Sequence, residues 1–446
     1  MDYLKRLNKL IPSGSHTYSR AHDQFSSNTP PIFKRGKGAY LYDKNEKKFL
    51  DYGMGLRSVG IGYSESQIDK AAIEGIKLGN NLTKASFIEL KAAEKFVKNF
   101  DNVDMVKFAK HGSTAVTGAI KLARAFTKKD YILRCADHPF FSFDDWFIGS
   151  TNFQAGIPRS ISKYTQNFRY FDIKKLKSKI VKLKNNISCL VMEASTVSCP
   201  IQNCCKKYPC QLSNQNNYFL KQIENICKEN KIVFILDEMI TGFRWDLKGA
   251  QNLYKIKPDL STFGKAIANG FSLAAVGGKQ KIMELASLEK SKKNNLFFLS
   301  STHGAEMVSL NAFIKTLEFY KKENVIKKNM SFGQNLKSNF NTICNDLNLG
   351  EVINMDGLAC SPFINFNYKN NNLRLKTFFQ QEMIKKNIII PWISISYRHR
   401  TKELNKTLNA SYDVLKKIKV SLRTKGKFFI KGKVIKPIFK KIYENK

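Results

Sequence analysis

The sequence lacks any run of about 18 apolar residues, the length that a membrane-spanning helix requires. Its first residues, from Met1 to Leu7, also contain no apolar segment of the kind found in a secretory signal. These absences argue against a secreted or membrane-embedded protein. We therefore expect a cytoplasmic chain whose nine cysteines stay reduced.

Paired Cys-x-x-Cys units, the common ligands of structural zinc, are missing as well. The densest group of cysteines has an irregular spacing and comprises Cys199, Cys204, Cys205 and Cys210. We interpret this stretch as an irregular loop and predict no metal site. Zinc binding there is the less favoured alternative.

Acidic residues are scarce: 36 Asp and Glu stand against 75 Lys and Arg, which gives a formal net charge of +39. Such an excess can indicate a nucleic-acid or membrane partner. The lysines are scattered, however, and the strongest concentration is the tail at residues 423–441, where bases alternate with apolar residues. This pattern favours an anionic substrate or a solvated surface, and we expect no nucleic-acid partner.

A chain of 446 residues with 43% hydrophobic residues is too long for one compact unit. We expect an N-terminal arm and hairpin at residues 1–64, a large domain at 65–310, and a small C-terminal domain with a basic tail at 311–446. Short strands alternate with helices through the large domain, at 105–109, 131–133, 188–193 and 232–237. This order predicts an α/β fold with a mostly parallel sheet covered on both faces, which binds ligands at the C-terminal ends of its strands.

One of these strands ends in an acid. Ile232-Val-Phe-Ile-Leu-Asp237 is apolar and β-branched, so we expect it to bring the Asp237 carboxylate to the edge of the sheet. Lys265 lies further along, after Gly264 and before a glycine-rich segment. A pyridoxal phosphate enzyme needs such a pair, because a lysine holds the aldehyde as a Schiff base and an acid keeps the ring nitrogen protonated. The alternative is a core strand that ends in a helix-capping Asp, with a surface lysine.

Two turns have the composition of phosphate sites. Gly112 and Ser113 end one strand and open a helix, where free N–H groups, the helix dipole and a hydroxyl meet. The second turn contains Thr302 and again precedes a helix. A simple N-cap is the alternative for the first turn.

Other strand ends carry further candidates. His138 and Phe140 follow one of them, and either ring is suited to stack on a planar cofactor, although ordinary core aromatics are the alternative. Glu193 ends another strand in the same way as Asp237, and we assign it to substrate binding.

With these segments in this order, the chain resembles the class III pyridoxal phosphate-dependent aminotransferases of fold type I, and within them the glutamate-1-semialdehyde aminomutase-like proteins. Asp237-Glu-Met-Ile-Thr-Gly-Phe-Arg244 is similar to the family's Asp-Glu-Val-x-Thr-Gly-Phe-Arg stretch, and Pro258-Asp-Leu-Ser-Thr-Phe-Gly-Lys265 to its lysine motif. Further matches lie in the hairpin at residues 35–52 and in the helix at 119–125.

The resemblance implies a large domain with a central, mostly parallel sheet and a smaller α/β domain built from the N-terminal arm and the C-terminal region. It implies that Lys265 forms the internal aldimine and carries a proton between substrate and cofactor. It also implies that Asp237 pairs with the pyridine nitrogen and that Gly112 and Ser113 hold the phosphate.

The remaining roles also come from the resemblance. Thr302 aligns with a threonine that reaches the phosphate of the neighbouring subunit, which implies a homodimer with shared active sites. His138 or Phe140 falls where the family places its stacking ring, and the alignment leaves both open. Arg20 aligns with an arginine that holds a substrate carboxylate.

Several departures from the family lie near the expected site. The phosphate turn reads His111-Gly-Ser-Thr-Ala115 where the family usually has Ser-Gly-Thr-Glu-Ala. Glu306 stands where the aminomutase has the asparagine of Gly-Asn-Pro, and extra cysteine-rich residues follow Glu193. These changes argue against glutamate semialdehyde as the substrate and leave the cofactor chemistry intact.

We therefore expect an aminotransferase that moves an amino group from a small-molecule donor to a carbonyl acceptor through a ping-pong cycle on Lys265. We place it in a biosynthetic pathway for a modified sugar, a polysaccharide or a secondary metabolite. The alternative is a glutamate-1-semialdehyde 2,1-aminomutase that serves tetrapyrrole synthesis. A third hypothesis, a binding protein without catalysis, is disfavoured because Lys265 and Asp237 are both present.

Overall fold

The structure is a computed structural model, and it describes residues 2–184, 186–195, 214–293, 295–368, 371–424 and 428–436. The chain divides into two compact units. The first unit joins residues 1–65 to residues 324–440, and the second consists mainly of residues 66–323. The cysteine-rich stretch from Cys199 to Cys210 lies outside the described residues.

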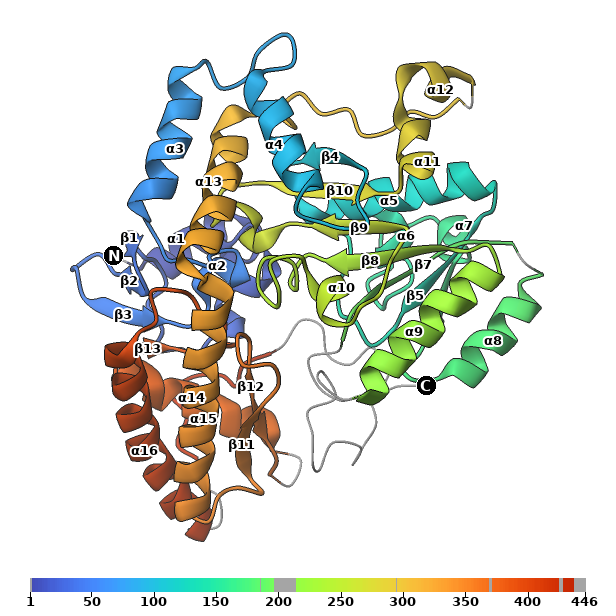
Figure 1. The fold of residues 1–446 in the computed structure, drawn as a ribbon. Coiled ribbons are helices and arrows are strands. Elements are labelled where there is room, and N and C mark those ends of the chain that lie inside the picture. Colours follow the sequence, from blue (N-terminus) through green and yellow to red (C-terminus); the bar gives the residue numbers. More distant parts are fainter. Residues whose placement is uncertain are drawn as a thin grey trace. The chain divides into compact units, whose positions relative to one another are not determined.

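The second unit is built on a seven-stranded sheet with the order β4-β10-β9-β8-β7-β5-β6 (Figure 1). The strands are β4 (Met105–Ala109), β5 (Tyr131–Cys135), β6 (Thr165–Phe168), β7 (Ile187–Glu193), β8 (Val233–Glu238), β9 (Leu260–Phe263) and β10 (Ala274–Gly278). Strands β6, β5, β7, β8 and β9 run parallel, whereas β10 is antiparallel to both of its neighbours. This confirms the mostly parallel sheet expected from the sequence.

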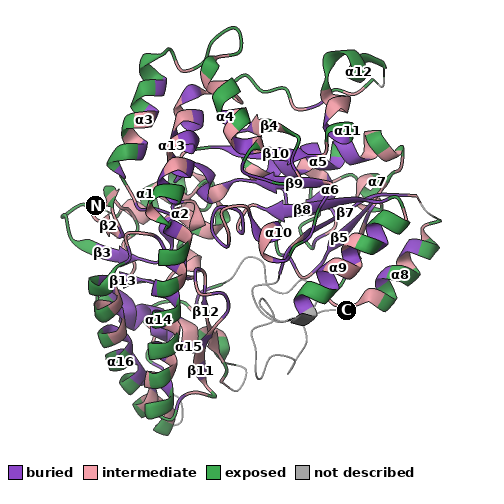
Figure 2. Cartoon of the chain, viewed as in Figure 1, coloured by how far each residue is buried: buried purple, intermediate pink, exposed green. Residues whose placement is uncertain are grey.

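Apolar layers cover both faces of the sheet, and its strands are buried along most of their length (Figure 2). On one face, α5 (Gly112–Thr127) packs against alternate strand residues such as Val191, Ile235 and Val276. On the other face, Phe96 of α4 (Phe87–Val97) lies against Phe263 at 5.2 Å between ring centroids. This alternation is what a parallel sheet between two helical layers requires.

The other helices of the second unit connect or flank these strands. They are α3 (Ser66–Lys77), α6 (Asp145–Ile148), α7 (Arg159–Ser162), α8 (Ile173–Lys182), α9 (Asn214–Glu229), α10 (Ala250–Leu253), η5 (Lys265–Ala268), α11 (Gln280–Met283), η6 (Glu284–Ala286), α12 (Leu288–Lys293) and α13 (Met307–Glu323). Helix α4 begins with a capping box, since the Ser86 hydroxyl and the Glu89 carboxylate each accept a backbone N–H of the other residue.

The first unit contains a four-stranded sheet with the order β1-β2-β3-β13. Its strands are β1 (Arg35–Lys37), β2 (Tyr40–Tyr42), β3 (Lys48–Asp51) and β13 (Ile388–Ile389), and a separate hairpin joins β11 (Ile353–Asp356) to β12 (Phe363–Phe366). Its helices are α1 (Tyr3–Leu10), η1 (Pro12–Gly14), η2 (Tyr18–Arg20), η3 (His22–Gln24), α2 (Met54–Arg57), α14 (Val325–Asp346), α15 (Asn372–Lys385) and α16 (Thr401–Arg423).

Strand β13 pairs with β3 in parallel, so the C-terminal region completes the sheet of the N-terminal arm. This confirms the smaller α/β domain formed by both ends of the chain, as well as the hairpin of β2 and β3. The division at residues 64 and 310 stays a prediction. Within the described residues, no helix combines the length and the apolar character needed to cross a membrane.

Candidate active site

The Asp237 carboxylate is buried at the C-terminal end of β8. Its Oδ1 accepts hydrogen bonds from the backbone N–H of Met239 at 2.9 Å and from the hydroxyl of Thr262 at 3.1 Å. Both hydrogen bonds that Asp237 accepts from the described residues end on Oδ1, which leaves Oδ2 to a donor from a ligand. Burial raises the pKa of Asp237 to about 6, and the charge of Lys265 opposes part of this rise.

Lys265 begins η5 directly after β9. Its backbone is left-handed, with φ of 42°, a conformation that costs free energy in a residue other than glycine. The side chain is half-buried, and its charge acts on the Asp237 carboxylate. The turn after β9 therefore brings a lysine amine and a buried carboxylate to the same edge of the sheet.

Neighbouring strands align the other candidates with this pair. In the register of the sheet, Asp237 lies opposite Glu193 of β7 on one side and Thr262 of β9 on the other. The backbone N–H of Glu193 donates to Nδ1 of His138 at 3.2 Å. Three parallel strands thus place these residues at their C-terminal ends, where the sequence predicted a ligand site.

His138 and Phe140 differ in their surroundings. His138 is buried, and desolvation lowers the pKa of its imidazole to about 3, so the ring is neutral. Because Nδ1 accepts a hydrogen bond from the N–H of Glu193, Nε2 carries the proton, and the backbone of Ser195 also interacts with the ring. The Phe140 ring, by contrast, is 41% exposed and packs edge-on against Phe147.

The predicted phosphate turn forms the N-terminus of α5. His111 is the N-cap, and its Nδ1 accepts a hydrogen bond from the N–H of Thr114. Ser113 is buried, and its hydroxyl oxygen accepts the N–H of Phe143 at 3.2 Å, so its hydroxyl hydrogen is available to a ligand. This turn therefore offers backbone and hydroxyl donors at the positive end of a helix dipole.

Met239 connects this turn to the lysine. Its sulfur lies 2.7 Å from the position that a Cβ on Gly112 would occupy and 2.6 Å from the corresponding position on Gly264. Both glycines are therefore needed for the thioether to fit between the two turns. Met239 was not among the residues predicted from the sequence, although it stands where the quoted family motif has valine.

A second link was also missed from the sequence. Lys110 precedes the phosphate turn and forms an ion pair with Glu306, and its Nζ donates to the Ser309 hydroxyl at 3.0 Å. Glu306 was noticed only as a departure from the family, and Lys110 lay unremarked beside the altered turn. The ion pair fixes the segment that follows Thr302, whose own side chain is exposed.

Arg20 belongs to the first unit, where it ends η2. Its charge acts on the hydroxyl of Tyr63 in that unit. The roles of Arg20 and Thr302 in the site stay predictions. Arg20 belongs to the first unit, and Thr302 is expected to act in the site of a second subunit.

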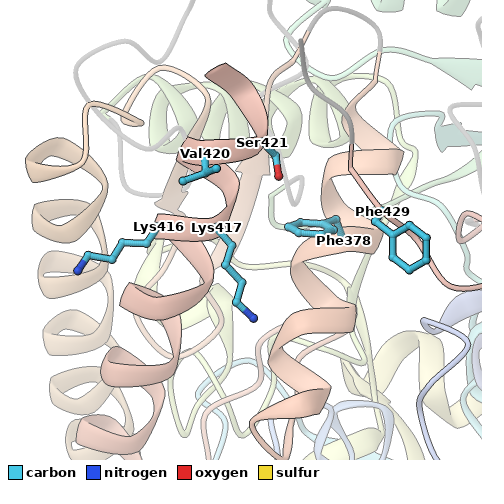
Figure 3. Close-up of a pocket in the computed structure, with 6 residues that line it drawn as sticks. All are labelled: Phe378, Lys416, Lys417, Val420, Ser421 and Phe429. Atoms are coloured by element: carbon cyan, nitrogen blue, oxygen red, sulfur yellow. The ribbon is translucent and has the colours of Figure 1, made fainter. Parts of the chain in front are cut away.

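The structure also contains an open pocket of about 430 Å³ in the first unit, formed by α15, α16 and the segment after them (Figure 3). Its lining comprises Phe378, Lys416, Lys417, Val420, Ser421 and Phe429. None of the candidate residues from the sequence lies in this lining. One of its two cations, Lys417, is already paired with Glu382 at 2.7 Å.

Comparisons with known proteins agree with this geometry. The sequence profile described as "Aminotransferase class-III" matches residues 21–207 and 212–386. A glutamate-1-semialdehyde 2,1-aminomutase from Wigglesworthia glossinidia brevipalpis is 30% identical over 440 residues, covering 92% of this chain and 96% of that protein. A 3-aminobutyryl-CoA aminotransferase from Cloacimonas acidaminovorans is 27% identical over 428 residues, covering 95% and 98%.

A solved structure has the same fold. The pyridoxal phosphate internal aldimine form of the FumI protein from Sphingopyxis sp. MTA144 superposes with a TM-score of 0.83 at 23% identity, covering 96% of this chain and 98% of that one.

Proposed function

The chain belongs to the class III aminotransferases, a family of pyridoxal phosphate-dependent enzymes, and we propose that it transfers an amino group from a small-molecule donor to a carbonyl acceptor. The observation that carries this proposal is the pair formed by Asp237 and Lys265. A buried carboxylate with one unshared oxygen lies within electrostatic reach of a lysine held in a strained turn.

The described residues of the second unit fit pyridoxal 5′-phosphate. Asp237 offers Oδ2 to a protonated ring nitrogen, and the N-terminus of α5 with Gly112 and Ser113 offers donors to a phosphate. His138 offers a buried, neutral ring at the same strand ends, which suits stacking on a planar cofactor. When bound, this cofactor accepts the electrons that the Cα–H bond of an amino acid releases.

Each residue then has a defined task. Lys265 would hold the cofactor aldehyde, and its amine would take up or return a proton at the substrate carbon. The Asp237 carboxylate would hold the ring nitrogen in its protonated form, and the low dielectric around this buried carboxylate would strengthen that interaction. His138 supplies a neutral ring beside the cofactor, and we assign substrate contacts to Glu193 and Arg20.

We place the reaction in a biosynthetic pathway for a modified sugar, a polysaccharide or a secondary metabolite. The turn at His111–Ala115 and the residues around Glu306 differ from those of the aminomutase, which supports an acceptor other than glutamate semialdehyde. The excess of basic residues suits an anionic acceptor.

The second candidate is intramolecular transfer, as in a glutamate-1-semialdehyde 2,1-aminomutase. It is supported by the 30% identical relative with that name, which aligns over 92% of this chain, and by the position of Arg20. Glutamate semialdehyde supplied alone, without an external amino donor, separates the two candidates, because only an aminomutase converts it.

A homodimer with shared sites is part of the proposal. One segment of the second unit exposes a series of large apolar side chains, namely Ile73, Ile76, Leu78, Leu82, Phe87 and Leu90. Asn80, within this segment, accepts hydrogen bonds from the N–H groups of Met307 at 2.8 Å and Val308 at 3.1 Å. An apolar patch of this kind is typical of a protein interface, and a second copy that covers it would also meet the nearby segment of Thr302.

The test is the visible absorption spectrum of the purified, cofactor-loaded protein before and after addition of L-glutamate. In the wild type we expect a yellow band that glutamate bleaches. In Lys265→Ala we expect either no such band or a band that glutamate leaves unchanged. A band that no amino donor alters, in a protein that converts glutamate semialdehyde alone, would establish the aminomutase. Absence of any band after addition of pyridoxal phosphate would overturn the cofactor roles of Lys265 and Asp237.

A further inference from the structure

A strained turn in the first unit holds Arg57 in a fixed place. Met54, Gly55, Leu56 and Arg57 have consecutive positive φ values of 42°, 57°, 61° and 69°. A left-handed turn of this length is costly for residues other than glycine, and such strain is typically found at functional sites.

Buried polar groups hold this turn. The Asp51 carboxylate accepts the N–H groups of Gly53 at 2.7 Å and Met54 at 2.8 Å, and it also accepts the Tyr63 hydroxyl at 2.6 Å. The Tyr63 oxygen in turn accepts the N–H of Gly55 at 2.7 Å. The carboxylate that lies closest in sequence to Arg57 is therefore engaged with the turn itself.

The turn carries Arg57 to Trp392. The guanidinium carbon lies 5.5 Å from the centroid of the indole ring, and the indole N–H donates to the carbonyl of Gly53 at 3.1 Å. The residues just before this tryptophan contact α15. The side-chain amide of Gln380, on that helix, donates to the carbonyls of Ile390 and Pro391 at 3.4 and 3.5 Å.

Lys376 lies one helical turn before Gln380 on the same face of α15. It is half-buried, and no residue in the described part of the chain forms a hydrogen bond or ion pair with its amine. Burial lowers the pKa of Lys376, and the nearby charge of Arg57 lowers it further. Glu382, a buried acid on this helix, is already paired with Lys385 and Lys417.

We propose that Arg57 and Lys376 form a binding site for an oxyanion, a carboxylate or a phosphate group. The two cations repel each other, and Lys376 has no anionic partner among the described residues. An oxyanion between them would remove that repulsion. The planar guanidinium binds two oxygens, and the ammonium group binds a third. The Trp392 ring orients the guanidinium.

This proposal extends the proposed function if the oxyanion belongs to the acceptor, and its test does not depend on turnover. Inorganic phosphate is titrated calorimetrically into the cofactor-loaded protein, in which the cofactor already fills its own phosphate site. We expect Lys376→Met to weaken phosphate binding about tenfold, as loss of one charge-assisted hydrogen bond does. A parallel titration with acetate distinguishes a phosphate site from a carboxylate site.

Lys416→Met is the matched control, because Lys416 lies on α16 and lines the separate pocket of Figure 3. It should bind phosphate as the wild type does. If Lys416→Met loses binding and Lys376→Met keeps it, the anion occupies that other pocket and the proposal is overturned. A wild-type protein that binds neither anion overturns it as well.

A second measurement distinguishes loss of the anion site from misfolding of the variant. In phosphate-free buffer, Lys376→Met should melt at a higher temperature than the wild type, because it removes an uncompensated cation from a half-buried place. Arg57→Asn is the second variant, since asparagine tolerates positive φ, and it should also weaken phosphate binding. Inhibition by phosphate that competes with the carbonyl acceptor assigns the oxyanion to the substrate, and noncompetitive inhibition assigns it to a separate ligand.

Discussion

Lys110 and Glu306, which are far apart in the sequence, form an ion pair that joins the turn before α5 to the segment before α13. Both residues are partly buried, with 18% and 24% of their side chains exposed. Of the two, only Glu306 stands at a position that departs from the family motif. Together they fasten the predicted phosphate turn to the segment that carries Thr302.

The first prediction concerns this ion pair. Lys110→Met and Glu306→Gln should each lower the free energy of unfolding by about 1–2 kcal/mol, because each leaves a partly buried partner uncompensated. The double variant should lose much less than the sum of the two losses, since the partners act as a unit. Denaturant unfolding of the four proteins measures the coupling. The more exposed pair of Lys95 and Glu318 serves as the control and should couple by less than about 1 kcal/mol.

The second prediction follows from the buried Asp237. Burial raises its pKa to about 6, above the value of about 3.9 in an unfolded chain. Between these two pH values the folded protein holds a proton that the unfolded protein has released, so the free energy of unfolding falls as the pH rises. Asp237→Asn cannot ionise. The cofactor-free variant should therefore exceed the cofactor-free wild type in stability by about 1–3 kcal/mol at pH 7.5, and the two should be similar at pH 4.

Burial raises the pKa of the neighbouring Glu238 to about 7 in the wild type, and the Asp237 charge adds to this rise. Asp237→Asn removes that added part, which increases the stability difference at pH 7.5 in the same direction. Denaturant unfolding at the two pH values gives the comparison. The same variant should lose at least about a hundredfold in turnover, because the amide cannot balance a charged ring nitrogen. If the variant and the wild type are equally stable at both pH values, burial does not destabilise the ionised Asp237 carboxylate.

The third prediction tests the contact of Met239 with two glycines. A methyl group on Gly112 would lie 2.7 Å from the Met239 sulfur, and Gly264 limits the space into which the thioether can retreat. Gly112→Ala should therefore destabilise the protein by about 1–3 kcal/mol, although alanine is the better helix former. Met239→Ala should restore part of this loss in the double variant. A Gly112→Ala variant as stable as the wild type would contradict the close packing.

The fourth prediction decides between the two candidate rings. His138→Ala should weaken cofactor binding about tenfold, because it removes a buried ring beside the strand ends of Glu193 and Asp237. Phe140→Ala, which truncates the more exposed of the two rings, is the control and should leave the dissociation constant within about twofold. The reverse order would place the stacking ring at Phe140. Spectroscopic titration with pyridoxal phosphate measures both.

The sequence predicted those parts of the site that depend on residues near each other in the chain better than those that depend on distant segments. The strand that carries Asp237 is a local pattern, and it lies where the periodicity placed it. Lys265 was selected for its glycine-rich surroundings, and in the structure it begins η5. The segment Ile388–Ser396 also has the composition of a strand, yet only Ile388 and Ile389 pair with β3. The residues beyond them have other hydrogen-bond partners. The N–H of Ser394, for example, donates to the carbonyl of Tyr52, and composition alone does not reveal such partners.

Contacts between distant segments were the least accessible. The pair of Lys110 and Glu306 and the place of Met239 between Gly112 and Gly264 depend on the packing of separate turns. Each residue is ordinary by itself, and its meaning arises from a neighbour that is remote in the chain. The left-handed turn that ends at Arg57 is similar, because its strain is offset by Asp51 and Tyr63 rather than by its own residues.

The last prediction tests whether two subunits share each site. If Thr302 serves the neighbouring subunit and Lys265 its own, Lys265→Ala and Thr302→Ala homodimers should both be impaired. A hybrid dimer then contains one site with both residues intact and one with neither. Random mixing should therefore restore roughly a quarter of the wild-type sites, since about half of the dimers are hybrids.

The two variants are mixed under conditions that exchange subunits, and the transamination rate is followed as the hybrids form. Phe87→Glu in the exposed apolar segment should weaken the interface and thereby lower the fraction of dimers, hybrids included, and sedimentation measures its oligomeric state independently. A Thr302→Ala protein with full activity would remove this threonine from the site. An impaired Thr302→Ala dimer that exchanges subunits yet gains no activity would place Thr302 in the same subunit's site as Lys265.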